Sequence, residues 1–139
     1  MILLDTNILS ELMKTAPEAS VLQWMNAFPA SEYWICAVSK AEIELGIALL
    51  PEGVRKAGLA RAAGLMFAEF PNPCLPFDAD AASRYAAIVA ERIRIGRPVS
   101  VEDAQIAAIA VTHGLTLATR NTKDFEFIKD LTIFNPWLS

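Results

Sequence analysis

Four acidic residues, far apart in the sequence, carry side chains suited to binding a hard divalent cation. They are Asp5, Glu42, Asp103 and Asp124. Carboxylate oxygens are ligands that Mg²⁺ and Mn²⁺ prefer, and such ions activate water for attack on phosphate esters. The chain has only 1 histidine and 2 cysteines, which disfavours zinc sites and Ser-His-Asp catalysis. The chemistry that remains open is metal-assisted hydrolysis at a cluster of carboxylates.

The distribution of apolar residues predicts strands that alternate with helices. Strands are expected at 2–4, 33–38, 75–77, 115–119 and 131–134. Helices are expected at 8–13, 18–28, 40–50, 54–70, 78–95 and 101–113, with one further helical turn at 125–128. This alternation favours a parallel sheet covered by helices on both faces. A chain of 139 residues fits one core, so we expect a single domain over 1–139.

Three of the four acids are predicted to lie at one edge of this sheet. In parallel α/β sheets, ligands bind beyond the carboxyl ends of the strands. Asp5 closes the first strand, Glu42 follows the second, and Asp124 follows the strand at 115–119 by a short loop. Asp103 instead opens the helix that leads into that strand, so this argument places it at the opposite edge.

Helix periodicity suggests that two of the acids face inward. Asp103 shares a helix face with Ile106 and Ala110, and Glu42 shares one with Leu45. A buried carboxylate is costly unless a cation or hydrogen-bond donors satisfy it. A bound divalent metal ion would remove that cost.

Helix capping is the competing interpretation of each acid taken alone. Ser39 and Glu42 have the spacing of a capping box, and Ser100 with Asp103 forms a weaker version. Asp5 can cap the helix that follows it. Asp124 can be an ordinary loop residue, so the pattern alone leaves both interpretations open.

The overall charge gives no sign of a large nucleic-acid footprint. The formal net charge is −4, although four arginines gather on one predicted helix and its end. These are Arg84, Arg92, Arg94 and Arg97, and they form either a local basic patch or a solvated helix face. We find no apolar stretch of membrane-spanning length and no secretory signal, so we expect a cytoplasmic protein with free, buried thiols at Cys36 and Cys74.

Several segments, in order along nearly the whole chain, resemble a known family. The segments are 2–7 (ILLDTN), 39–46 (SKAEIELG), 101–108 (VEDAQIAA), 117–125 (LATRNTKDF) and the ending at 135–137 (NPW). Each is modest alone, but together they are specific. The chain resembles PIN domains, and within them the VapC toxin group, particularly its FitB-like members.

The resemblance implies a three-layer α/β/α sandwich with a central, mainly parallel sheet. The acids of this family converge at one end of the sheet, which would bring Asp103 to the others. Asp5, Glu42 and Asp103 match the three principal acids.

The fourth acidic block departs from the family pattern. Many relatives have an aspartate where this chain has Asn121. Asp124 is therefore expected to carry the fourth carboxylate, with Asn121 as a weaker oxygen ligand or a positioning group. Thr6 and Thr119 match hydroxyl positions that support the site.

By resemblance, the chain is a metal-dependent endoribonuclease and the toxin of a type II toxin–antitoxin pair. Its expected cofactor is Mg²⁺ or Mn²⁺, its substrate is RNA, and its partner is a cognate antitoxin. The antitoxin, not this chain, would bind operator DNA, and its C-terminal segment would lie in a groove walled by the helices at 40–50 and 54–70. We also expect a homodimer.

Two alternatives to the nuclease come from other functional classes. The first is a regulatory or binding protein with the same fold, in which the acids cap helices and nuclease activity is vestigial. The second is a phosphatase that forms an aspartyl phosphate. That chemistry usually requires a second aspartate two residues after the nucleophile, and Asn7 stands there.

Overall fold

A four-stranded, entirely parallel sheet forms the centre of the computed structural model, which describes residues 1–139. The strand order is β2-β1-β3-β4, with β1 at Ile2–Leu4, β2 at Tyr33–Trp34, β3 at Thr116–Ala118 and β4 at Ile133–Phe134. The helices are α1 (Thr6–Leu12), α2 (Ala19–Asn26), α3 (Ala37–Ala48), α4 (Val54–Ala68), α5 (Ala79–Arg94) and α6 (Val101–Thr112). Short 3₁₀ turns lie at η1 (Ala30–Glu32), η2 (Thr122–Phe125) and η3 (Pro136–Leu138). The predicted alternation of strands and helices is confirmed.

Alternating side chains of the two central strands separate the interior into two layers. Leu3 and Leu117 belong to the apolar cluster beneath α5 and α6. Leu4 and Ala118, their neighbours in the chain, belong to the cluster beneath α1, α2, α3 and α4. Successive residues of a strand point to opposite faces, so this pattern shows helices on both sides. The expected three-layer α/β/α sandwich is confirmed.

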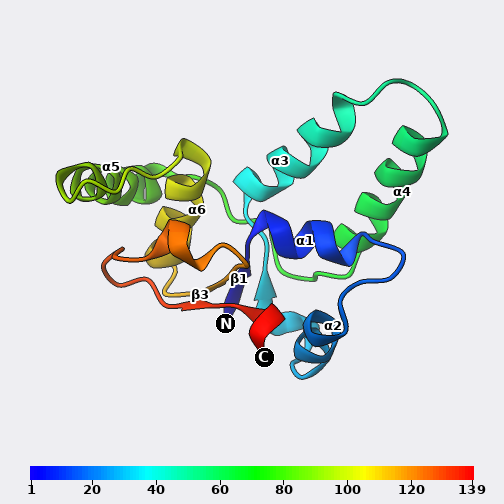
Figure 1. Ribbon diagram of the computed structural model, residues 1–139, viewed down its shortest axis with the longest axis horizontal. Coiled ribbons are helices and arrows are strands. Elements are labelled where there is room, and N and C mark those ends of the chain that lie inside the picture. Colours follow the sequence, from blue (N-terminus) through cyan, green and yellow to red (C-terminus); the bar gives the residue numbers. More distant parts are fainter.

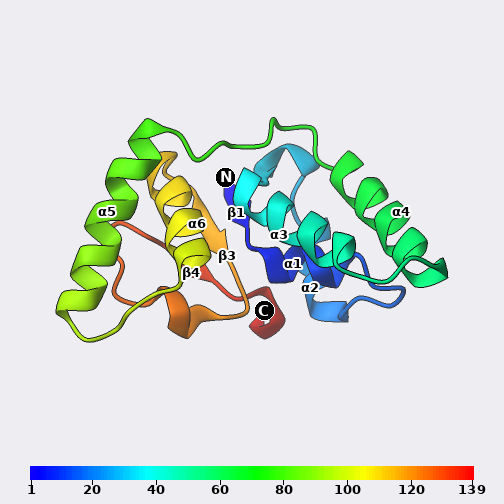
Figure 2. The same cartoon turned by 90° about the horizontal axis from the view of Figure 1, so that it is seen from above.

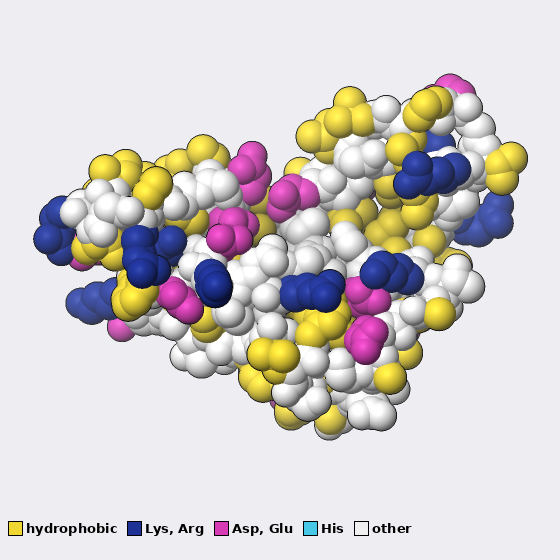
Figure 3. All heavy atoms as spheres, in the orientation of Figure 1, with side chains coloured by type: hydrophobic (Ala, Val, Ile, Leu, Met, Phe, Trp, Pro, Cys, Tyr) yellow, Lys and Arg dark blue, Asp and Glu magenta, His cyan; other side chains and the backbone are white.

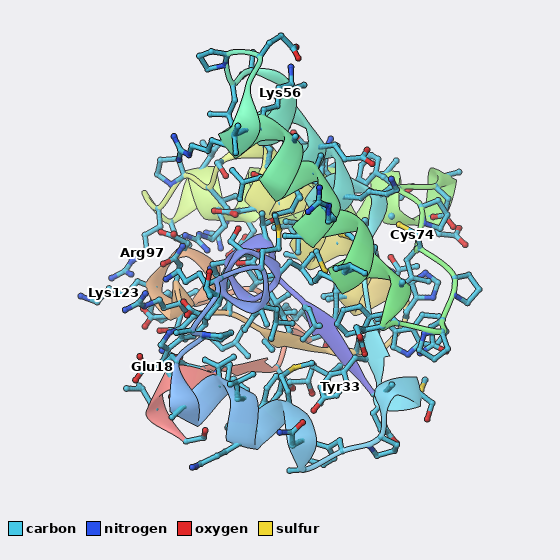
Figure 4. All side chains as sticks on the ribbon, turned by 90° about the vertical axis from the view of Figure 1, so that its right-hand side faces the viewer. Glu18, Tyr33, Lys56, Cys74, Arg97 and Lys123 are labelled. Carbon is cyan, nitrogen blue, oxygen red and sulfur yellow. The ribbon has the colours of Figure 1, made fainter.

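Two groups of helices flank the sheet. Helices α5 and α6 pack together on one side, while α1, α2, α3 and α4 lie on the other, as Figures 1 and 2 show. Helices α3 and α4 form a hairpin that projects from the body, and Lys56 lies near its tip (Figure 4). No helix is both long and apolar enough to cross a membrane.

Several predicted boundaries are wrong near the second strand. The strand predicted at 33–38 ends at Trp34, because α3 already begins at Ala37 with Cys36 as its N-cap. The strand predicted at 75–77 is reduced to one parallel bridge between Cys36 and Leu75. Both cysteines are free, as predicted, but Cys74 is exposed rather than buried.

The early start of α3 also overturns the proposed capping box. Ser39 lies within the helix, fully buried, and its hydroxyl accepts a hydrogen bond from the Cys36 thiol at 3.6 Å. Ser39 therefore does not cap α3, and Glu42 is not part of a capping box. The other predicted caps are confirmed, because Asp5 accepts a bond from the N–H of Thr6 and Ser100 accepts one from Asp103.

One of the four arginines gathered near α5 is buried and organises a loop. Only 4% of Arg92 is exposed, which excludes it from a basic patch or a solvated face. Its guanidinium donates hydrogen bonds to the carbonyl oxygens of Arg97, Asp124 and Glu126 at 2.6, 3.0 and 2.8 Å. The buried Arg92 side chain therefore connects α5 to the segment after β3 through hydrogen bonds that satisfy three carbonyl oxygens.

We expect Arg92→Met to destabilise the fold by about 3 kcal/mol, because three backbone carbonyls lose their charged donor. Urea unfolding measures the change, with Arg84→Met on the exposed side of the same helix as the matched control. Equal stability of the two variants would show that the buried guanidinium contributes nothing.

Candidate active site

A polar pocket of about 410 Å³ lies where α1, α3, α6 and the segment after β3 meet. Three of the predicted acids line it, namely Asp5, Glu42 and Asp103. Acidic side chains gather over the depression between the two groups of helices in Figure 3. Residues almost a hundred positions apart in the chain therefore share one concave surface.

Asp5 is the most deeply buried acid of the pocket. It follows β1 directly, its backbone N–H donates to the carbonyl of Ala118 at 3.0 Å, and only 4% of the residue is exposed. Its Oδ1 accepts from the Thr6 N–H at 2.8 Å, and its Oδ2 accepts from Thr119 Oγ1 at 2.7 Å. Burial raises the pKa of Asp5, these two hydrogen bonds oppose the rise, and the charges of Glu42 and Asp124 add to it.

Thr119 and Asn7 connect this carboxylate to its surroundings. Thr119 is fully buried, and its hydroxyl also accepts hydrogen bonds from Asn7 Nδ2 at 3.3 Å and from the Asn121 N–H at 3.1 Å. Asn7 Nδ2 donates to Asp5 Oδ2 at 3.2 Å, while its Oδ1 accepts from the Arg120 N–H at 3.2 Å. This network fixes the carboxylate before any ligand arrives.

Glu42 reaches the pocket from α3. Its Oε1 accepts a hydrogen bond from Thr6 Oγ1 at 2.7 Å, which links α3 to the first turn of α1. Its helix face is open rather than inward, because Leu45 is 59% exposed. The prediction that this helix face points inward was therefore wrong, and the Glu42 carboxylate lines the pocket instead.

Asp103 lies at the start of α6, on the same edge of the sheet as the other acids. The expectation from the chain order that it starts at the opposite edge is wrong, because α6 turns back through Gly114 and runs antiparallel to β3. Its pKa is raised to about 6, first by burial and then by the negative charge of Asp5. Asp124 and Glu42 raise it further, while the Ser100 hydroxyl lowers it.

Asn121 and Asp124, the two candidates for the fourth acidic position, lie differently with respect to the pocket. Asn121 lines the pocket, whereas Asp124 does not and is exposed. Asp124 is still close enough for its charge to raise the pKa of both Asp5 and Asp103. Its backbone carbonyl is held by Arg92, so the loop is fixed although the carboxylate is free.

Sequence reasoning missed six further lining residues: Asn7, Ser10, Glu11, Lys14, Arg120 and Trp137. Glu11 is buried, and its carboxylate accepts from Lys14 Nζ at 2.9 Å and from the Glu18 N–H at 3.0 Å. The Lys14 bond is the main cause of the lowered pKa of Glu11. The i, i+3 spacing of Glu11 and Lys14 on α1 signals the ion pair, but nothing local signals that it borders the acids.

The donor set fits a magnesium-type ion without forming a complete cage. No three Asp, Glu, His or Cys side chains lie close enough to hold a metal alone. Mg²⁺ usually keeps several waters and binds through one or two carboxylates together with substrate phosphates. Asp5 supplies a buried carboxylate of raised pKa, which a cation would stabilise in its charged form.

Comparison with known proteins identifies the family. The PIN domain model matches residues 2–130 of the chain. The chain belongs to the PIN-domain family. Among PIN-domain relatives, it is 39% identical to the VapC ribonuclease Y4jK of Sinorhizobium fredii, over 99% of this chain and 98% of that protein. It is 38% identical to Toxin FitB of Neisseria gonorrhoeae, over 99% of both chains.

Solved structures of similar chains agree with the observed fold. FitAB bound to a DNA fragment contains a chain that is 38% identical and superimposes with a TM-score of 0.88, covering 99% of this chain and 96% of that one. A toxin–antitoxin complex from Klebsiella pneumoniae contains a chain that is 27% identical, with a TM-score of 0.73 and 98% coverage of both. The predicted membership of the VapC and FitB group is confirmed.

We expect Asp103→Asn to stabilise the fold, with a gain that grows with pH. The folded pKa of about 6 exceeds the ordinary value of 3.8, so ionisation of Asp103 opposes folding. The destabilisation caused by ionised Asp103 is absent below the ordinary pKa of 3.8. It develops as the pH rises towards the folded pKa of about 6, and it is complete above that value.

Urea unfolding at several pH values measures this gain in the metal-free protein. Asp80→Asn, at an exposed position in the first turn of α5, is the matched control. A gain from Asp103→Asn that is the same at pH 4 and pH 8 would contradict the repulsive environment described for this carboxyl group.

Proposed function

We propose that this chain is a metal-dependent endoribonuclease that serves as the toxin of a type II toxin–antitoxin pair. The observation that carries the proposal is the convergence of Asp5, Glu42 and Asp103 on one pocket. Family membership supports it, since a relative that aligns over nearly its whole length is named a VapC ribonuclease and another a toxin.

The residues of the chain divide the work of hydrolysis. Asp5 and Asp103 would hold the ion, Mg²⁺ or Mn²⁺, and Glu42 would bind it directly or through water, or accept the proton of the attacking water. Asp124 or Asn121 would complete the fourth position, with Asp124 orienting water or holding a second ion. When bound, the metal lowers the pKa of its water and neutralises charge on the phosphodiester.

The supporting hydroxyls keep two of these carboxylates in place. Thr119 Oγ1 donates to Asp5, and Thr6 Oγ1 donates to Glu42, each at 2.7 Å. Each bond leaves carboxylate lone pairs available to the pocket, because a carboxylate can accept several hydrogen bonds. Fixed orientation reduces the reorganisation needed when substrate binds.

We expect Asp5→Asn to lower RNA cleavage by about two orders of magnitude or more, because the ion loses its most buried ligand. The variant should remain folded, since an asparagine oxygen can still accept from Thr119. Cleavage of a labelled RNA during Mg²⁺ and Mn²⁺ titrations measures the loss, with Asp80→Asn purified in parallel as the control. Undiminished cleavage by the Asp5 variant would reject the assignment of Asp5 as a metal ligand. If the wild-type protein does not cleave RNA at any Mg²⁺ or Mn²⁺ concentration, the regulatory alternative is favoured.

The proposed antitoxin site is a groove beside the acids. It has a volume of about 330 Å³ and lies between α1 and the α3–α4 hairpin. Ile43, Ile47, Leu50 and Leu59 supply apolar walls. Four residues line both this groove and the acidic pocket: Thr6, Ser10, Lys14 and Glu42. A segment seated in the groove would therefore reach the edge of the pocket and obstruct it.

We expect Gly46→Phe to prevent inhibition by the cognate antitoxin while RNA cleavage persists. Gly46 lines the groove, and a Cβ there meets nothing within 4 Å, so a bulky side chain fills the groove and not the core. Gly46→Ala is the matched control and should remain inhibited. Inhibition assays and co-purification with the antitoxin measure the effect, and full inhibition of the Phe variant would place the antitoxin elsewhere.

The remaining parts of the proposal concern assembly and location. The FitAB structure contains a DNA fragment, which supports DNA binding by a toxin–antitoxin complex. We propose that the antitoxin, and not this chain, contacts operator DNA. We expect the toxin to form a homodimer, which light scattering of the free protein tests. The proposed site of action is the cytoplasm, where substrate RNA and antitoxin are both present.

A further inference from the structure

The candidate site presents an electrostatic problem for an RNA substrate. Asp5, Glu11, Glu42 and Asp103 all line the pocket, and the formal net charge of the chain is −4. A polyanion gains most of its non-specific affinity from lysine and arginine contacts to phosphate. Binding of RNA therefore requires a basic side chain at the pocket that is free to contact the phosphates of the substrate.

Two cationic side chains line the pocket, and they differ in availability. Lys14 forms an ion pair with Glu11 at 2.9 Å, so its charge is largely neutralised. Arg120 is exposed and forms no ion pair. Its guanidinium is therefore not held in an ion pair, although its charge is close enough to lower the pKa of Glu11.

The backbone of Arg120 is fixed on both sides. Its N–H donates to Asn7 Oδ1 at 3.2 Å, and the same asparagine donates to the Asp5 carboxylate. Its carbonyl accepts a hydrogen bond from Asn135 Nδ2 at 3.4 Å, while Asn135 Oδ1 accepts from the Trp137 N–H at 2.9 Å. The position of Arg120 is thus tied both to the buried acid and to the C-terminal turn.

The side chain of Arg120 is also supported. Its Cζ lies 5.0 Å from the centre of the Trp137 ring, in the arrangement of a cation–π contact. Trp137 itself packs against the apolar cluster beneath α1 and α2, so the ring is anchored. An arginine held against an aromatic ring keeps its N–H groups available for a phosphate, which the planar guanidinium binds in a forked geometry.

Resting on the proposed ribonuclease function, we infer that Arg120, supported by Trp137, binds a phosphate of the RNA backbone beside the acidic pocket. The contact gives the substrate its position relative to Asp5, since Asn7 joins Arg120 and Asp5 directly. Basic side chains form a row across the face shown in Figure 3, and Arg97 and Lys123 project on one side of the molecule in Figure 4. Arg97 is paired with Glu126 at 3.7 Å and does not line the pocket.

The test compares Arg120→Gln, Arg120→Lys and Arg61→Gln, the last at an exposed arginine of α4 outside the pocket. Steady-state cleavage of a single-stranded RNA gives kcat and KM, and binding to the same RNA is measured over a range of salt concentrations. We expect Arg120→Gln to raise KM about tenfold, with a smaller change in kcat. The slope of log affinity against log salt should become shallower by about 0.7, the value for one lost phosphate contact on a single strand.

Arg120→Lys should restore the salt slope and only part of the affinity, because it keeps the charge but loses the planar fork. Arg61→Gln should leave both measurements at wild-type values. If Arg120→Gln matches wild type, or weakens binding with no change in slope, the phosphate contact is wrong. Failure of the wild-type protein to cleave or bind RNA would instead overturn the proposed function itself.

Discussion

The hydrogen bond from Thr119 to the carboxylate of Asp5 is the contact on which the site depends. It joins residues separated by more than a hundred positions, at the ends of the adjacent parallel strands β1 and β3. A buried carboxylate needs donors, and this pair satisfies one oxygen within the protein while the pocket remains open. Asn7, Asn121 and Arg120 are then placed by bonds to the same pair or to each other. The geometry of the pocket is therefore a consequence of strand register.

The clustering of acids opposes folding and supports chemistry. The negative charge of Asp5 raises the pKa of Asp103, Glu42 and Asp124 raise the pKa of both groups, and burial increases the effect. Such repulsion is tolerated because the sheet and the helix starts hold the backbone rigidly beneath the carboxylates. A cation would relieve the repulsion. The same charges that weaken the metal-free fold are thus suited to binding an ion that stabilises it.

Much of the fold was predictable because its signals are local. The apolar run at Ile2–Leu4 marks β1, and Ser100 marks the start of α6. The role of Ser39 was mispredicted, because the true helix start depends on the bridge between Cys36 and Leu75, a contact between distant segments. Arg92 was misjudged for the same reason, since its carbonyl partners belong to a loop that the sequence does not associate with α5.

The site was predictable in part. Asp5, Glu42 and Asp103 were proposed from residue type and family resemblance, and they line one pocket. The placement of Asp103 from chain order alone failed, because a helix that precedes a parallel strand starts at the carboxyl edge of the sheet. Arg120 and Trp137 were missed as pocket residues, since they meet only through the C-terminal turn.

The four residues common to the groove and the acidic pocket make the two sites thermodynamically linked. If groove occupancy blocks RNA, bound RNA must weaken the occupant by the same factor, because coupling between two ligands is reciprocal. Abundant substrate would then promote release of the inhibitor, and a scarce substrate would leave inhibition tight. The threshold at which the enzyme becomes active would therefore depend on the concentration of its RNA as well as on that of its partner.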